Sequence, residues 1–295
     1  LLSDPDLRNS MGSHAYHTTR NMTWENVVAE YEKVFRKNIK TESHVEQLPK
    51  IRFNHLMRLT DDFGVIQFAR NRVPDIGSGY VLDDVARALI VCSMHYKKFG
   101  EGKDLKLMET YLNFIKYIQD EDGKFYNVVD RRKHIDKNVW SHDAHGRTIW
   151  ALGHLMSIEN VPESLKNHAR ELFNKSLGVN QCINSPRAMC FLILGYHFYN
   201  KLNNSESNVK VIRSLADNLV SMFKENATSD WKWFEQYLTY DNSKFPESLF
   251  YAYQSTKDEE YLKVAVDSLN FLVSVCFEDD IFNPIGQRGW YVRDK

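Results

Sequence analysis

The sequence has no excess of charge of either sign and no long apolar run. Lys and Arg together number 38, and Asp and Glu together number 39, among 295 residues. No block of basic residues occurs, which argues against nucleic acid or an anionic membrane as the main partner. The longest apolar runs, such as residues 188–198, are shorter than the roughly 20 residues of a membrane-spanning helix. We therefore expect no membrane span.

Signals of secretion and of disulfide bonding are also missing. The chain begins at Leu1 without the basic segment and apolar run of a signal peptide, and its missing initiator Met predicts a fragment of a longer protein. The cysteines Cys92, Cys182, Cys190 and Cys276 show no C-x-x-C spacing and lie in apolar helical patterns. We expect reduced core thiols in a cytoplasmic protein.

Several familiar cofactor motifs are absent. The sequence has no Gly-rich phosphate loop and no G-x-S-x-G turn. His142 and His145 lie three residues apart, but no second cluster has the spacing of metal ligands. We expect no metal and no cofactor.

Helical periodicity is abundant. Apolar residues make up 43% of the chain, and in almost every segment they recur at the i, i+3, i+4, i+7 spacing of an amphipathic helix. An acidic start and a Lys-rich end before Gly100 delimit the clearest example, residues 82–99. The pattern predicts helices at residues 23–37, 48–59, 82–99, 104–119, 144–157, 162–175, 187–201, 207–224, 246–255 and 258–275.

The connections alternate between short and long from residue 82 onward. A short turn makes two consecutive helices an antiparallel hairpin, so four hairpins are expected between residues 82 and 275. All long connections then meet at one rim, where the first helix of each hairpin begins. This is the arrangement of an all-α toroid whose inner ring consists of those first helices. Small strand hairpins are expected at residues 62–74 and at 121–129, where an Asp-Gly turn occurs.

Residues 1–37, which begin with "LLSDPDLRNSMGSHAYHTTRNMTWENVVAEYEKVF", resemble the C-terminal tail of a family 4 GT-B glycosyltransferase. The resemblance rests on a D-P-x-L-R-x-x-M-G helix, residues 4–12, followed by a T-W-x-x-V-V-A-x-Y helix that starts at residue 23. It implies a tail domain at residues 1–38 and an upstream glycosyltransferase domain as partner. The nucleotide-sugar site of that family lies upstream of this stretch, so the resemblance assigns no donor-binding residue.

Residues 50–295 resemble the helical domain fused behind some bacterial family 4 glycosyltransferases, a relative of the six-hairpin (α/α)6 glycosidases. The motifs are "HLMRLTDDFGVIQFA", "GYVLDDVARALIV", "SHDAHGRTIWALG", "SPRAMCFLILG", "WKWFEQYLTYDNSKFPESL" and "PIGQRGWY". The resemblance implies a toroid domain at residues 48–295. Nine helices are expected after residue 45 and six hairpins need twelve, so we expect a ring truncated at its C-terminus or an open arc. His142 stands where the family pattern has a Glu, which puts any role of that Glu in doubt.

The catalytic candidates are carboxylates of the expected rim, because glycoside cleavage needs an acid and an opposing carboxylate. We expect Asp84 or Asp143 as base or nucleophile, with Asp61 and Asp62 nearby. Glu235 lies among the rings of "WKWFEQY", which disfavour its charged form and suit a general acid. The alternative for Asp84 and Asp143 is a plain helix-start role.

The substrate-binding candidates surround these carboxylates. Arg147 follows Asp143 by four residues, within reach of a local ion pair. Arg187, at a Pro-led helix start, is expected to anchor an acidic group or a loop. The full set is Asp83, Trp140, His142, His145, Arg147, Arg187, Trp231, Trp233, Tyr240, Asp241 and Trp290, with the tryptophans as stacking platforms for sugar rings.

Three functions remain open. The first is a carbohydrate-active domain that binds, and cleaves, an oligosaccharide or polysaccharide at the rim. The second is a sugar epimerase or polysaccharide lyase on the same toroid, for which His142, His145, Arg187 and Tyr240 are available. The third is a non-catalytic domain that holds an acceptor glycan or acts as a scaffold for a glycosyltransferase. The fold analogy carries much of this reasoning.

Overall fold

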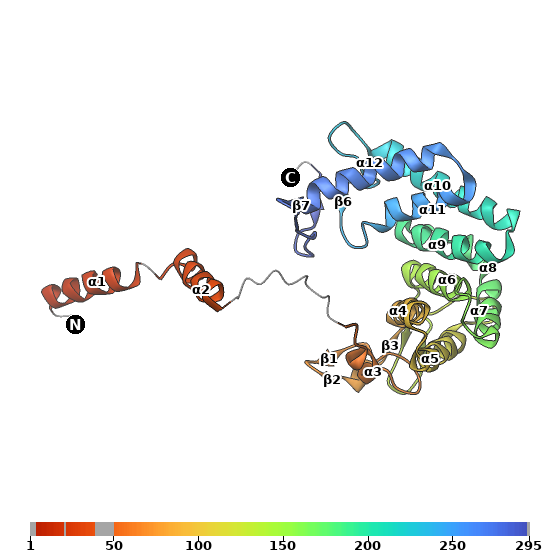
Figure 1. Ribbon diagram of the computed structural model, residues 1–295, viewed down its shortest axis with the longest axis horizontal. Coiled ribbons are helices and arrows are strands. Elements are labelled where there is room, and N and C mark those ends of the chain that lie inside the picture. The colour runs from red at the N-terminus through yellow and green to blue at the C-terminus, as the bar shows by residue number, and fades with distance from the viewer. Residues whose placement is uncertain (1–3, 21, 39–49, 294–295) are drawn as a thin grey trace. The chain divides into compact units, whose positions relative to one another are not determined.

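The computed structural model describes residues 4–20, 22–38 and 50–293. The chain divides into two compact units, residues 1–52 and residues 53–295. The first unit consists of helices α1 (Pro5–Thr19) and α2 (Trp24–Asn38) (Figure 1). Asp4 caps α1 by accepting the backbone N–H groups of Asp6 at 3.1 Å and Leu7 at 3.0 Å. The expected helix at residues 23–37 is confirmed as α2.

The second unit contains four helical hairpins in its described residues, as predicted. They are α4 (Leu82–Phe99) with α5 (Gly102–Ile118), α6 (His142–Met156) with α7 (Glu163–Lys175), α9 (Pro186–Asn203) with α10 (Glu206–Asn226), and α11 (Lys244–Thr256) with α12 (Glu259–Cys276). Gly100, Asn204 and Lys257 end three of the first helices in the left-handed conformation, which allows the tight reversal. The short helices α3 (Asn54–Leu59) and α8 (Leu177–Asn180) and the 3₁₀ turn η1 (Ile76–Ser78) complete the set.

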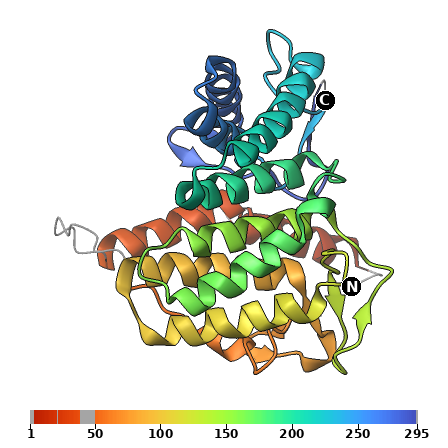
Figure 2. The same ribbon diagram turned by 90° about the vertical axis from the view of Figure 1, so that its right-hand side faces the viewer.

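The first helices of the hairpins are neighbours in space. Helix α6 packs against α4 and α9, and α9 packs against α11, so that α4, α6, α9 and α11 follow one another in a row (Figure 1). The second helices α5, α7, α10 and α12 lie outside this row, which Figure 2 shows from the side. This inner and outer arrangement is the predicted one.

Glycines bring α6 and α9 together. A Cβ atom added at Gly153 would collide with the carbonyl oxygen of Gly195, and one added at Gly195 would lie 2.6 Å from the carbonyl oxygen of Ile149. A Cβ atom at Gly146 would lie 2.8 Å from the carbonyl oxygen of Ala188. The backbones of the two helices are therefore in direct contact along much of their length.

The strands are short. The hairpin expected at residues 62–74 is confirmed as β1 (Ala69–Arg70) paired with β2 (Val73–Pro74). The small hairpin expected at the Asp-Gly turn in residues 121–129 is confirmed in a minimal form, because Gln119 and Phe125 form an antiparallel bridge across the turn at Gly123, whose φ is 89°. Beyond this bridge, β4 (Val128–Val129) pairs with β3 (Tyr80–Val81) and β5 (Ile135–Asp136).

Two more pairs lie near the C-terminal end of the described residues. Strand β6 (Tyr237–Leu238) pairs with β9 (Tyr291–Val292), and β7 (Phe277–Glu278) pairs with β8 (Ile281–Phe282). The first pair ties the connection before α11 to the last described segment.

The cysteines are free, and three of the four lie in the core as expected. Burial raises the pKa of the Cys92 and Cys190 thiols to about 12. Cys182 is a correction, because it is exposed and lies in the turn between α8 and α9. Within the described ranges, no helix has both the length and the apolar composition needed to cross a membrane.

Candidate functional site

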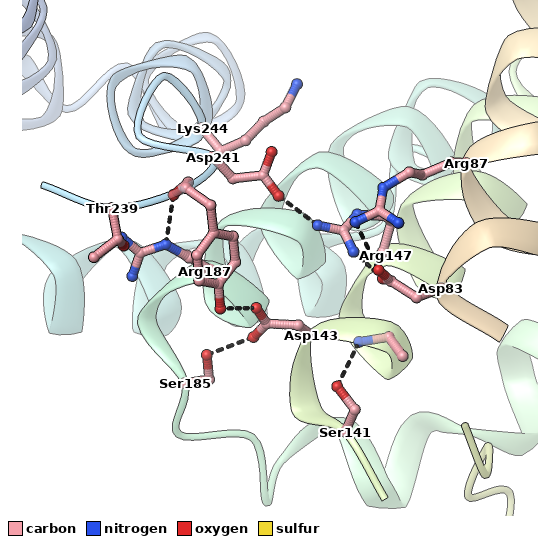
Figure 3. Close-up of polar contacts among 12 residues, drawn as sticks. Asp83, Arg87, Ser141, Asp143, Arg147, Ser185, Arg187, Thr239, Asp241 and Lys244 are labelled. Atoms are coloured by element: carbon pink, nitrogen blue, oxygen red, sulfur yellow. Dashed lines mark hydrogen bonds and ion pairs between the residues drawn. The ribbon is translucent and has the colours of Figure 1, made fainter. Parts of the chain in front are cut away.

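Charged side chains from three inner helices and from one long connection meet on the side where the inner helices begin (Figure 3). Asp83 and Asp84 lie in the first turn of α4, Asp143 in the first turn of α6 and Arg187 in the first turn of α9. Residues 227–243, which connect α10 to α11, add Glu235, Tyr240 and Asp241. The structure thus brings together residues that the sequence separates by up to 158 positions (Asp83 to Asp241). We call this group the rim cluster.

Arg147 joins α4 to the loop before α11. Its guanidinium forms ion pairs with Asp83 and with Asp241, and its side chain is only 3% exposed. The guanidinium also lies 4.2 Å from the centre of the Phe191 ring. The expected local pair of Arg147 with Asp143 is wrong, because the long side chain reaches across the rim to these two carboxylates instead.

Asp83 and Asp84 both form ion pairs with Arg87, in addition to the pair of Asp83 with Arg147. Arg87, one turn further along α4, lies 2.6 Å from an Asp83 oxygen and 3.0 Å from an Asp84 oxygen. Partial burial raises the pKa of Asp84, against the opposing charge of Arg87. Both carboxylates are thus held by arginines at the start of α4.

Asp143 accepts hydrogen bonds from two hydroxyl groups. Ser185 donates to one carboxylate oxygen and Tyr240 to the other, each at 2.7 Å. The plain capping role does not apply to Asp143, because Ser141 caps α6 by accepting the backbone N–H of Ala144 at 3.2 Å. The Asp143 carboxylate is therefore free to face the rim.

Arg187 anchors the loop, as expected from the sequence. Its Nε donates to the carbonyl oxygen of Tyr240 at 2.8 Å, and one Nη donates to the Thr239 hydroxyl at 2.6 Å. The other Nη lies 2.9 Å from a Glu235 carboxylate oxygen. Arg187 therefore binds both an acidic group and the backbone of the long connection.

Burial raises the pKa of Glu235, the charge of Asp143 raises it further, and the ion pair with Arg187 opposes both. The direction expected from the sequence is confirmed. The cause differs in part, because Trp231 contacts Glu235 through a hydrogen bond from Nε1 to the backbone carbonyl oxygen, at 2.8 Å. The partner of the carboxylate itself, Arg187, was not foreseen.

Two of the four tryptophans expected as stacking platforms, Trp231 and Trp233, are a correction. Trp233 is 0% exposed and Trp231 is 6% exposed, so neither presents a ring face to a ligand. They pack with Phe245 and Phe271 in the core beneath the loop. Trp140 is half-buried beside His142, and Trp290 is 39% exposed.

The two histidines at the start of α6 have different environments. His145 is fully buried, and its Nε2 lies 2.8 Å from the side-chain oxygen of Asn180. Burial lowers the pKa of His145 to about 4, so its expected role in binding substrate is corrected to a place in the core. His142 is half-buried, and its Nδ1 accepts the backbone N–H of Asn184 at 3.3 Å.

Asp61 is engaged in local structure. It accepts the backbone N–H of Phe63 at 2.8 Å and the Tyr80 hydroxyl at 2.6 Å, whereas Asp62 is exposed. In the described ranges, no three acidic, His or Cys side chains are grouped to hold a metal ion.

Sequence reasoning missed Trp150 and Lys244. The Lys244 ammonium lies 4.2 Å from the centre of the Trp150 ring and 2.6 Å from a carboxylate oxygen of Glu247. The half-buried Trp150 ring is parallel to that of Phe191, with centroids 6.0 Å apart. The signal was present, because Trp150 follows Asp143 by seven residues and so lies two turns below it on the same helix face.

Comparison with known proteins gives structural likeness only. No family model and no curated protein matches the sequence. A cellobiose 2-epimerase from Bacillus thermoamylovorans has a TM-score of 0.62 and 13% identity, over 76% of this chain and 69% of its own. A sugar epimerase from a ruminal bacterium has a TM-score of 0.61 and 13% identity, over 81% and 74%. A D-mannose isomerase has a TM-score of 0.58 and 11% identity, over 80% and 72%.

These likenesses confirm the predicted fold class, an all-α toroid of the (α/α)6 type. They do not bear on the resemblance of residues 1–37 to a glycosyltransferase tail, which stays a prediction.

Proposed function

We propose that the toroid unit binds a sugar at the rim cluster and transfers protons on it, as a sugar epimerase or isomerase does. The observation that carries this proposal is the setting of Asp143, whose two partners are neutral hydroxyl groups. Among the described residues no cation forms an ion pair with this carboxylate, which suits a general base. The three similar structures, a cellobiose 2-epimerase, a sugar epimerase and a D-mannose isomerase, support the same class.

The surroundings of Asp143 suit a polar ligand with flat faces. Carboxylates and hydroxyls at the rim provide hydrogen bonds to sugar hydroxyls, and the exposed part of the Tyr240 ring supplies an apolar surface beside them. The rim thus offers both kinds of contact that sugars need. Four free cysteines support a cytoplasmic location as part of the same proposal.

Glycoside cleavage is the second candidate, and the raised pKa of Glu235 favours it. In that reaction Glu235 protonates the leaving oxygen, and Asp143 or Asp84 acts as base or nucleophile. The ion pair of Glu235 with Arg187 opposes protonation, and we therefore rank this chemistry below proton transfer on carbon. Sugar binding without reaction, in a domain that serves a glycosyltransferase, is the third possibility kept from the sequence.

One experiment separates the three. The protein is incubated with a panel of reducing monosaccharides and oligosaccharides in D₂O, and products are followed by NMR. Epimerisation or isomerisation gives a new sugar of the same chain length, whereas hydrolysis shortens the chain. Binding alone perturbs the sugar signals without any product.

Matched variants assign the residues. Asp143→Asn is expected to lower kcat by about 100-fold or more, because a positioned base contributes roughly that much. Glu235→Gln lowers kcat by a similar factor only if the reaction is hydrolysis. Glu225→Gln, on the exposed face of α10, is the control and keeps wild-type activity. Wild-type turnover by Asp143→Asn would contradict the proposal.

A further inference from the structure

Arg187 fixes the segment that carries Tyr240. The guanidinium binds the Glu235 carboxylate, the Thr239 hydroxyl and the Tyr240 carbonyl oxygen, at 2.9, 2.6 and 2.8 Å. It also lies 4.6 Å from the centre of the Tyr240 ring. With a side chain only 6% exposed, Arg187 holds this segment from the protein side.

The residues after Tyr240 add a second anchor. Asp241 adopts φ of 49°, the left-handed conformation, and its carboxylate pairs with the buried Arg147. The side chain of Asn242 accepts the N–H of Thr239 at 3.0 Å and donates to the carbonyl oxygen of the same residue at 2.8 Å. The backbone on both sides of Tyr240 is therefore fixed.

The result is a hydroxyl group held in one place on an exposed side chain. Tyr240 is 50% exposed, yet its hydroxyl donates to Asp143 at 2.7 Å. A tyrosine that served only packing would bury its ring, as Tyr111 and Tyr196 do. Partial burial, together with the hydrogen bond to Asp143 and its charge, raises the pKa of Tyr240 to about 12, so the phenol keeps its proton at neutral pH.

We propose that Tyr240 is a catalytic residue, the proton donor to the sugar oxygen, and that Arg187 is the residue that positions it. This rests on the proposed function, with an open-chain aldose as the substrate class. The Asp143 carboxylate and the Tyr240 hydroxyl are adjacent, so one bound sugar reaches both when its C1 and C2 lie over the pair.

The reaction balances without an oxidant or a reductant. Asp143 takes the proton from C2, the C2–H electron pair forms a C1=C2 bond, and the carbonyl electron pair moves to O1, which takes the Tyr240 proton. The enediol then loses the O2 proton to the Tyr240 phenolate, forming C2=O2. The C1=C2 electron pair takes the proton back from Asp143 at C1, which yields the ketose and restores both residues.

The first test is a kinetic comparison on the sugar that the panel shows to react best. Tyr240→Phe should lower kcat by about 100-fold or more, with KM changed by less than about threefold, because it removes one hydroxyl and keeps the ring. Tyr253→Phe, on α11 outside the rim, is the matched control and should keep wild-type kinetics. Turnover that survives Tyr240→Phe overturns this assignment and leaves the proposed function standing, whereas absence of turnover on every sugar overturns both.

The second test concerns positioning. Arg187→Lys keeps a positive charge but cannot form three separate hydrogen bonds in a fork, so kcat should fall by at least about tenfold at unchanged KM. In ¹³C-tyrosine NMR without sugar, the Tyr240 signal, identified by its loss in Tyr240→Phe, should shift in Arg187→Lys while the other tyrosine signals stay in place. An unmoved Tyr240 signal together with wild-type kcat overturns the role of Arg187.

Discussion

Arg187 and Glu235 form an ion pair in which the guanidinium nitrogen and the carboxylate oxygen are 2.9 Å apart, although 48 residues separate them in the chain. Both side chains are at least nine-tenths buried. Two opposite charges buried this deeply stabilise each other, but a single buried charge without its partner destabilises the folded state. The pair therefore makes the loop before α11 dependent on the start of α9.

Removal of Arg187 alone is expected to destabilise the protein strongly. Arg187→Met leaves the Glu235 carboxylate buried without its cation, which typically costs about 3–5 kcal/mol of unfolding free energy. The double variant Arg187→Met with Glu235→Leu removes the stranded charge and should recover part of that loss. Urea unfolding measures both. A loss below about 1 kcal/mol in the single variant would contradict a buried, coupled pair.

Mild acid should destabilise the fold through buried histidines. Burial lowers the pKa of His145, His154 and His197 from 6.5 to about 4. As the pH falls, these histidines are protonated in the unfolded chain before they are protonated in the folded protein. Their neutral forms therefore cost no stability above pH 6.5, and the unfolding free energy declines as the pH falls from 6.5 toward 4. Between pH 7.5 and pH 5 each histidine should account for about 1–2 kcal/mol of unfolding free energy.

The urea midpoint, followed between these two pH values, tests this expectation. His154→Leu removes one of the three groups and should make the pH dependence less steep by about that histidine's share. If the slope of this variant equals that of the wild type, His154 does not titrate as its burial implies.

The contact between α6 and α9 should not tolerate a methyl group. Gly153→Ala places a Cβ atom on the carbonyl oxygen of Gly195, and backbone cannot move aside as a flexible side chain can. Overpacking of this kind costs about 1–3 kcal/mol or more. Gly178→Ala is the control, because no atom lies within 4 Å of its added Cβ. Equal thermal midpoints for the two variants would refute the close contact.

The left-handed backbone of Asp241 predicts an unusual order of stability. Asp241→Gly and Asp241→Ala both lose the ion pair with Arg147, but glycine adopts φ of 49° without strain. Asp241→Gly should therefore be the more stable of the two by about 1 kcal/mol. At the neighbouring Ser243, with φ of −60°, alanine should be at least as stable as glycine. Chemical denaturation of the four variants gives the comparison.

Much of the helical frame follows from the sequence, because periodicity and punctuation act locally. The helix expected at 82–99 agrees with α4 at both ends, since acidic residues begin it and Gly100 ends it. The alternation of short and long connections also predicted that inner helices begin on one side. What failed were contacts between distant segments. The edge at Tyr80 and Val81 decided where β4 pairs, and no local pattern records that edge.

In the site, too, the features set by local sequence were predicted, and the contacts between distant segments were not. Asp143, Arg187 and Glu235 were expected at the rim from their places in the chain, and the structure brings them together there through Tyr240 and the Arg187 ion pair. The burial of Trp231 and Trp233 was not predictable, because a loop that folds back over a core has the same composition as one that faces a ligand. The partners of Arg147 were equally out of reach, since a local carboxylate lay at the right spacing and two distant ones were bound instead.

The glycine contacts between α6 and α9 also bear on accuracy at the rim. These helices carry Asp143 and Arg187, and backbone pressed against backbone leaves no room for either to slide or roll. Flexible side chains between two helices allow small relative shifts, and at these glycines no such side chains separate α6 from α9. The base and the arginine that aligns the neighbouring phenol therefore keep a fixed spacing, which is set by glycines between about one and three turns further along these two helices.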